Sequence, residues 1–115
     1  MIARAALLLA LLAAGRDDPL AGRTAGAPQE CLDLGRVQGP DIAGPRTILY
    51  RENRRRIWRV APVGTCTPLR TGDTLVVELY GRQMCRDDRF SVVRNGIARG
   101  GPCRFSRFVP YTQAR

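Results

Sequence analysis

The sequence predicts an all-β fold, a small disulfide-stapled barrel or sandwich of about five to seven short antiparallel strands. One reason is that apolar and polar residues alternate in short runs after residue 30, as they do in half-buried strands. Another is that turn residues separate these runs, with 12 glycines and 8 prolines in a chain of 115 residues. In addition, no run after residue 30 has the periodicity of an amphipathic helix.

The N-terminal region predicts export. Residues 1–15 have a basic start followed by an Ala/Leu run from Ala5 to Ala14, which is the pattern of a signal peptide helix. A buried Ala/Leu helix is the alternative. The apolar run is shorter than the roughly 20 residues that span a bilayer, so we expect no membrane-spanning segment after cleavage. Position 16 is arginine rather than a lipidation cysteine, and we therefore expect a periplasmic or secreted protein without a lipid anchor.

Composition divides the rest of the chain into two parts. Residues 16–30 are rich in glycine, alanine, proline and charge and lack apolar periodicity, so we expect a flexible tether there. Residues 31–115 remain for one small β domain. A domain of this size usually needs cross-links such as disulfides to stabilise its small core.

The first expected strand is 32–34, and the next two are 47–51 and 56–61. The latter two flank a polar stretch at 52–55, which predicts a hairpin. Because side chains alternate across a strand, each of the two covers the core with one face and shows arginine or threonine on the other. The side chains expected on the core faces are those of Ile48, Tyr50, Trp58 and Val60.

The second half continues with a strand at 74–80. A strand at 89–94 leads into Asn95-Gly96, a strong hairpin signal, so that 97–99 returns as its partner. The last expected strand is 103–109. The residues of the 74–80 strand expected to face the core are Leu75, Val77 and Leu79.

Four cysteines in a small exported chain predict two disulfides. Three pairings are possible, and we favour Cys66–Cys85, which flanks one apolar strand, with Cys31–Cys103, which would tie the ends of the domain together. No metal site is expected, because no two cysteines have C-x-x-C spacing and the chain has no histidine. A catalytic thiol would also lack its histidine partner.

Several segments of the chain, taken in this order, form a pattern: Cys31 to Val37, Arg46 to Tyr50, Trp58 to Pro62, Cys66 with Leu69, Met84 to Asp88, Gly101 to Cys103 and Phe108 to Pro110. This pattern resembles a family of small exported bacterial proteins with a four-cysteine β domain, known only as a domain of unknown function. The resemblance covers nearly all of the chain from Cys31 to Pro110, and its most specific feature is the cysteine order with the step from Cys85 to Asp88. It implies an exported, disulfide-bonded protein and assigns no activity and no site residues.

Composition also excludes several kinds of chemistry. The 19 basic residues are all arginine, against 10 acidic residues, for a net charge of +9. Without lysine or histidine there is no Schiff base, no P-loop lysine and no histidine general base. Ser91 and Ser106 lie in strand-like runs without a G-x-S-x-G turn, so a triad hydrolase is excluded as well.

What remains is a non-enzymatic binding module without cofactors. Arginines and aromatic residues alternate on the 47–61 hairpin, and guanidinium groups suit phosphate and carboxylate ligands. We expect an anionic lipid, glycan or acidic protein of the cell envelope as the partner, although arginines on a merely solvated face would give the same composition. The candidate anion-binding residues are Arg51, Arg54, Arg55, Arg56, Trp58 and Arg59.

Two other function classes stay open. An envelope enzyme or inhibitor could use Asp88, Asp73 or Glu78 with arginine partners. For the Asp87-Asp88 pair, a turn after Cys85 with one aspartate bonded to a backbone amide or to a neighbouring arginine is the simpler interpretation. Single-stranded nucleic-acid binding is the third class, and it is unexpected for an exported protein.

Overall fold

Ten β-strands and one short 3-10 helix make up the regular structure of residues 18–64 and 66–114, the part that this computed structural model describes. The expected signal peptide at 1–15 lies outside the described residues, and so do positions 16 and 17 of the expected tether. The elements are β1 (Arg23–Ala25), β2 (Cys31–Asp33), η1 (Leu34–Arg36), β3 (Gln38–Gly44), β4 (Thr47–Arg51), β5 (Arg56–Val60), β6 (Thr74–Val77), β7 (Gln83–Cys85), β8 (Arg89–Arg94), β9 (Ile97–Arg104) and β10 (Val109–Gln113).

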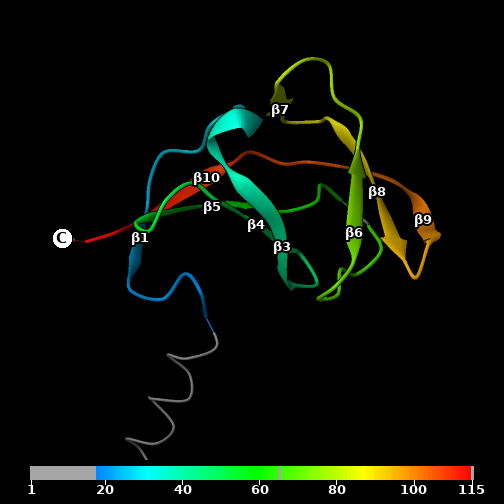
Figure 1. Ribbon diagram of the computed structural model, residues 1–115, viewed down its shortest axis with the longest axis horizontal. Coiled ribbons are helices and arrows are strands. Elements are labelled where there is room, and N and C mark those ends of the chain that lie inside the picture. The colour runs from blue at the N-terminus through cyan, green and yellow to red at the C-terminus, as the bar shows by residue number, and fades with distance from the viewer. Residues whose placement is uncertain (1–17, 65, 115) are drawn as a thin grey trace, which may run out of the picture.

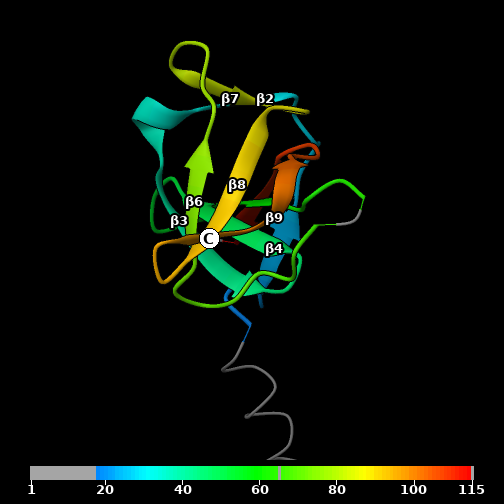
Figure 2. The same cartoon turned by 90° about the vertical axis from the view of Figure 1, so that its right-hand side faces the viewer.

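The strands form three antiparallel sheets, which confirms the all-β class. A five-stranded sheet has the order β1-β10-β5-β4-β3, and a three-stranded sheet has the order β6-β8-β9. The first lies toward the left of Figure 1 and the second toward the right. A two-stranded sheet of β2 and β7 lies across the top of both, as Figure 2 shows from the side.

The hairpin of β4 and β5 has the expected strands and the expected core face. Tyr50 pairs with Trp58 in the register, and both side chains are buried. The opposite face, however, also buries Leu49 and Ile57, where only arginine and threonine were expected. Leu49 lines a cavity there together with Pro19 and Leu20, so the segment before β1 covers part of this outer face.

The sequence did not indicate three of the strands. β1 lies inside the segment expected to be a flexible tether, and its three residues pair with β10, so that expectation is wrong for residues 23–25. β3 contains two glycines and a proline and is interrupted by register shifts, which hide its alternation. β7 has only three residues and pairs with β2.

The C-terminal strands also lie elsewhere than expected. β9 runs on to Arg104, and the next strand is 109–113 rather than 103–109. Pro110 is tolerated inside β10, where its carbonyl accepts a hydrogen bond from the Gly26 amide at 2.7 Å. β6 ends at Val77, and Leu79, expected in the core, is 41% exposed.

The core lies between the five-stranded and three-stranded sheets. All three phenylalanines of the chain are fully buried there, and the ring of Phe105 lies 4.4 Å from that of Phe90 and 5.8 Å from that of Phe108. The Tyr50 hydroxyl reaches the Met84 sulfur at 3.6 Å, and burial raises the pKa of Tyr50 to about 12. Other buried members of the core are Leu32, Ile42, Ile48, Trp58, Val60, Leu69, Val92 and Cys103.

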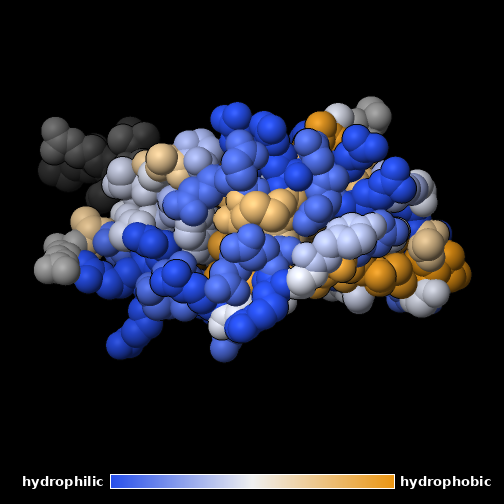
Figure 3. Space-filling model, turned by 90° about the horizontal axis from the view of Figure 1, so that it is seen from above, coloured by the Kyte–Doolittle hydropathy of each residue, from blue (hydrophilic) through white to orange (hydrophobic). Residues whose placement is uncertain are grey.

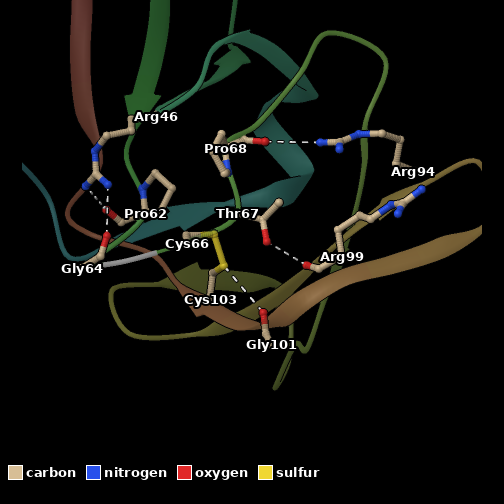
Figure 4. The surroundings of a disulfide bond; sticks show 10 residues. All are labelled: Arg46, Pro62, Gly64, Cys66, Thr67, Pro68, Arg94, Arg99, Gly101 and Cys103. Atoms are coloured by element: carbon tan, nitrogen blue, oxygen red, sulfur yellow. Dashed lines mark hydrogen bonds between the residues drawn. A yellow bond between two sulfur atoms is a disulfide. The ribbon is translucent and has the colours of Figure 1, made fainter.

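The disulfides are Cys31–Cys85 and Cys66–Cys103, so both expected pairings are wrong. Cys31 and Cys85 stand directly opposite each other in the β2–β7 pair, which brings their sulfurs together. Cys66, in the loop after β5, meets Cys103 on β9 (Figure 4). Arg46 holds the same loop by donating to the carbonyls of Pro62 and Gly64 at 2.8 and 3.0 Å.

The two disulfides close interleaved loops with sequence separations of 54 and 37 residues. By the chain-entropy relation each contributes about 4 kcal/mol to the free energy of unfolding. We therefore expect the double substitution Cys31→Ser with Cys85→Ser to lower that free energy by a few kcal/mol, as measured by urea unfolding.

Non-reducing peptide mapping tests the pairing itself. Digestion after arginine separates all four cysteines, because arginines lie between them. We expect linked peptides for Cys31 with Cys85 and for Cys66 with Cys103; a Cys31–Cys103 peptide as the main species would contradict the structure.

Candidate anion-binding site

The tip of the β4–β5 hairpin is a tight, hydrogen-bonded turn over residues 52–55. The Asn53 side-chain oxygen accepts from the backbone amides of Arg55 and Arg56, each at 2.9 Å. The amide of Glu52 donates to the Arg56 carbonyl at 3.1 Å. Asparagine favours such turns because its side chain can replace a backbone acceptor.

Neighbouring strands hold the tip from behind. The Arg23 guanidinium, on β1, donates to the carbonyl of Arg55 at 2.6 Å and to that of Arg54 at 3.3 Å. The Gln113 amide, on β10, also donates to the Arg55 carbonyl, at 2.7 Å. No sequence pattern indicated the role of Arg23, because this residue lies in the segment expected to be a tether.

Two of the candidate residues form the base of the hairpin instead of its binding surface. Trp58 is only 4% exposed, and its indole nitrogen donates to Glu52 at 2.9 Å. Arg56 lies 3.8 Å from the same carboxylate and 6.0 Å from the indole ring centre. Glu52 therefore ties both side chains to the hairpin.

Three candidate arginines remain together at the open end of the hairpin. Arg51, Arg54 and Arg55 are all exposed, and no carboxylate of residues 18–64 or 66–114 lies within 4.0 Å of them. Arg59 lies on the same outer face of the sheet as Arg51, but it pairs in the register with Leu49, farther from the turn. The candidate site is thus reduced to the tip with Arg51, Arg54 and Arg55, which Arg23 supports through its bonds to the backbone.

Two of the three carboxylates considered for an enzyme or inhibitor, those of Asp88 and Asp73, bond to groups of the fold itself. Asp88 accepts from the Cys85 amide at 2.7 Å, and Asp87 lies 3.8 Å from the Arg86 guanidinium, which confirms the turn interpretation. Glu78 is exposed at the end of β6. Within the described residues, no group of three or more acidic, cysteine or histidine side chains could hold a metal ion.

Asp73 binds Arg94 through two hydrogen bonds. Arg94 Nε and a terminal nitrogen donate to the two carboxylate oxygens at 2.8 and 2.9 Å, and the Arg70 amide donates at 2.8 Å. The same guanidinium donates to the Pro68 carbonyl at 3.2 Å (Figure 4). The hydrogen bond from Arg94 is the main cause that lowers the pKa of Asp73 from 3.8 to about 2.

Comparisons with known proteins return nothing similar: no family model, no curated protein and no solved structure matches the chain. Over residues 18–64 and 66–114, no helix is long and apolar enough to cross a membrane.

The lowered pKa of Asp73 predicts an acid-dependent loss of stability. The carboxylate is ionised at lower pH in the folded chain than in the unfolded chain, so its contribution is complete above about pH 4 and is lost as the pH falls toward 2. We expect Asp73→Asn to lower the free energy of unfolding at pH 7, and this difference from the wild type to shrink between pH 4 and pH 2. Urea unfolding at several pH values measures it.

Glu78→Gln is the matched control, because Glu78 is exposed and forms no ion pair with the described residues. A difference for Asp73→Asn that stayed constant down to pH 2 would contradict the role of the Arg94 pair.

Proposed function

We propose that this chain is an exported, non-enzymatic binding module of the cell envelope, and that the tip of the β4–β5 hairpin binds an anionic component there. The observation that carries the proposal is a group of three exposed arginines, Arg51 at the end of β4 and Arg54 and Arg55 on the hydrogen-bonded turn, with no carboxylate of the described residues within 4.0 Å. Membership of the family of small exported bacterial proteins that the sequence resembles is part of the same proposal.

Two disulfides indicate an oxidising compartment outside the cytoplasm. This supports a periplasmic or secreted location. The apolar faces of the five-stranded and three-stranded sheets meet in one core, which supports a small sandwich as the framework that carries the tip.

Charge and rigidity both favour a phosphate or carboxylate ligand. Arginine donates in a planar fork that matches these groups. Five arginines and one glutamate surround the tip, namely Arg23, Arg51, Arg54, Arg55, Arg56 and Glu52. Because the turn is already ordered, ligand binding loses little conformational entropy of the backbone.

The position of Trp58 favours an envelope anion over single-stranded nucleic acid. Proteins of the latter class stack bases on exposed aromatic rings. Tyr50 and Trp58, the aromatic residues that flank the tip arginines in sequence, are both buried. Exposed apolar side chains gather at the other end of the molecule, around β6 and the β8–β9 turn, which is the right-hand end of Figure 3. We therefore expect the hairpin end of the molecule, and not the apolar end, to contact an anionic surface.

We expect Arg54→Gln with Arg55→Gln to weaken binding to vesicles that contain phosphatidylglycerol. Each arginine near an anionic surface contributes about 1 kcal/mol, so the double variant should bind roughly 30-fold more weakly at low salt. Vesicle co-sedimentation measures the change, and binding of the wild type should fall as salt is raised.

The matched control is Arg89→Gln with Arg104→Gln. This pair removes the same charge from two exposed arginines that face each other on β8 and β9. Equal losses for the two double variants would show that net charge alone drives binding and would rule out the tip as the site. Lipopolysaccharide and an acidic polysaccharide, tested in the same assay, distinguish the lipid from the glycan partner.

A further inference from the structure

A second cationic surface lies away from the hairpin tip. It is a groove of about 500 Å³ between the segment before β2, strand β5 and the segment that joins β9 to β10. Its apolar lining comes from Pro28, Val63 and Val109, and three arginines surround this lining, namely Arg59, Arg86 and Arg107. The volume is in the range of small-molecule sites in proteins.

Backbone hydrogen bonds fix the walls of the groove. The Arg86 amide donates to the Glu30 carbonyl at 2.7 Å, and the Asp87 amide donates to the Phe105 carbonyl at 2.9 Å. The Ser106 hydroxyl donates to the Ala61 carbonyl at 2.7 Å. The groove is therefore formed before any ligand arrives, which lowers the entropic cost of binding.

Glu30 shows how a carboxylate fits this site. One of its oxygens lies 3.1 Å from Arg86 Nε, and the other lies 3.2 Å from Arg107 Nε. The glutamate and both arginines are about half exposed, with side-chain exposures of 57, 44 and 54%. Solvent-exposed ion pairs contribute little to stability, so another carboxylate can replace Glu30 at small cost.

Arg59 supplies a third guanidinium. It lies on the outer face of β5 and lines the groove, and no carboxylate of residues 18–64 or 66–114 lies within 4.0 Å of it. Asp87 also lines the groove, 3.8 Å from Arg86. With Glu30 displaced, the groove presents three cationic groups and one acidic group beside an apolar strip.

We propose that this groove binds the carboxylate of a single-chain fatty acid. The acyl chain lies on Pro28, Val63 and Val109, and the head group takes the place of Glu30 between Arg86 and Arg107, with Arg59 beside it. This ligand chemistry follows from the apolar strip next to a pair of guanidinium groups that already hold a carboxylate. The site does not depend on the hairpin tip.

Dodecanoate below its micelle concentration is the probe, titrated calorimetrically into the full chain. We expect saturable binding that Arg107→Gln and Arg59→Gln each weaken by roughly tenfold, because each removes a charge-assisted hydrogen bond to the head group. Glu30→Gln should tighten binding by roughly threefold, because it removes the competing carboxylate. Acetate and methyl dodecanoate, which lack the chain and the charge respectively, should bind much more weakly.

Two controls separate this site from charge in general and from the tip. Arg89→Gln removes one charge outside the groove, and Arg54→Gln with Arg55→Gln removes two charges of the tip. Both should leave dodecanoate binding unchanged. All variants should keep the thermal transition of the wild type. The proposal is overturned if acetate binds as well as dodecanoate, if the groove variants match Arg89→Gln, or if Glu30→Gln weakens binding. The two proposals can fail separately. If dodecanoate binds the groove but the tip variant binds vesicles as well as the wild type, only the tip proposal fails.

Discussion

The Cys31–Cys85 bond joins two strands of three residues each, and both the core and the groove depend on it. Strands this short do not form a stable pair alone. The cross-link holds them in register, so that Leu32 and Met84 point inward together and Met84 reaches the Tyr50 hydroxyl. On the other side of the bond, the residues next to the two cysteines are Glu30 and Arg86, which pair with each other; Arg86 lines the groove. One covalent bond therefore positions a part of the core and a part of the surface.

Several arginines of this chain stabilise the fold by donating hydrogen bonds to two groups at once, in a planar geometry that lysine lacks. A guanidinium has five donors in a fixed plane, whereas an ammonium group is a compact point charge. Arg94 bonds a carboxylate and a carbonyl at once, Arg46 bonds two carbonyls of the loop that carries Cys66, and Arg23 bonds two carbonyls of the hairpin tip. Composition alone left open whether these residues form only a solvated face. For these three, the contacts show that they build the fold.

The parts of the fold that sequence predicted are those set by local chemistry. Alternation identified β4 and β5, and the Asn95-Gly96 turn, with φ angles of 54° and 77°, placed β8 against β9. The strands that were missed, β1, β3 and β7, are short or rich in glycine and proline, and they exist because they pair with other strands. The disulfide prediction failed for the same reason, since the partner of Cys85 is set by the β2–β7 pair.

The sequence predicted which residues belong to the candidate hairpin, but not which of them are exposed at its tip. Strand alternation sends Trp58 into the core and both Arg51 and Arg59 to the outer face; Arg51 ends β4 beside the turn, and Arg54 and Arg55 lie in the turn itself. The two cationic surfaces consequently act over different distances. The tip arginines have no carboxylate within 4.0 Å in the described chain, so their field extends to about a Debye length, roughly 8 to 10 Å. The charge of the groove is partly neutralised by Glu30 and Asp87, so the ligand proposed for it would be held by shape and desolvation on contact. The proposed attraction to an anionic surface and the proposed selection of a small ligand thus rest on separate parts of this domain.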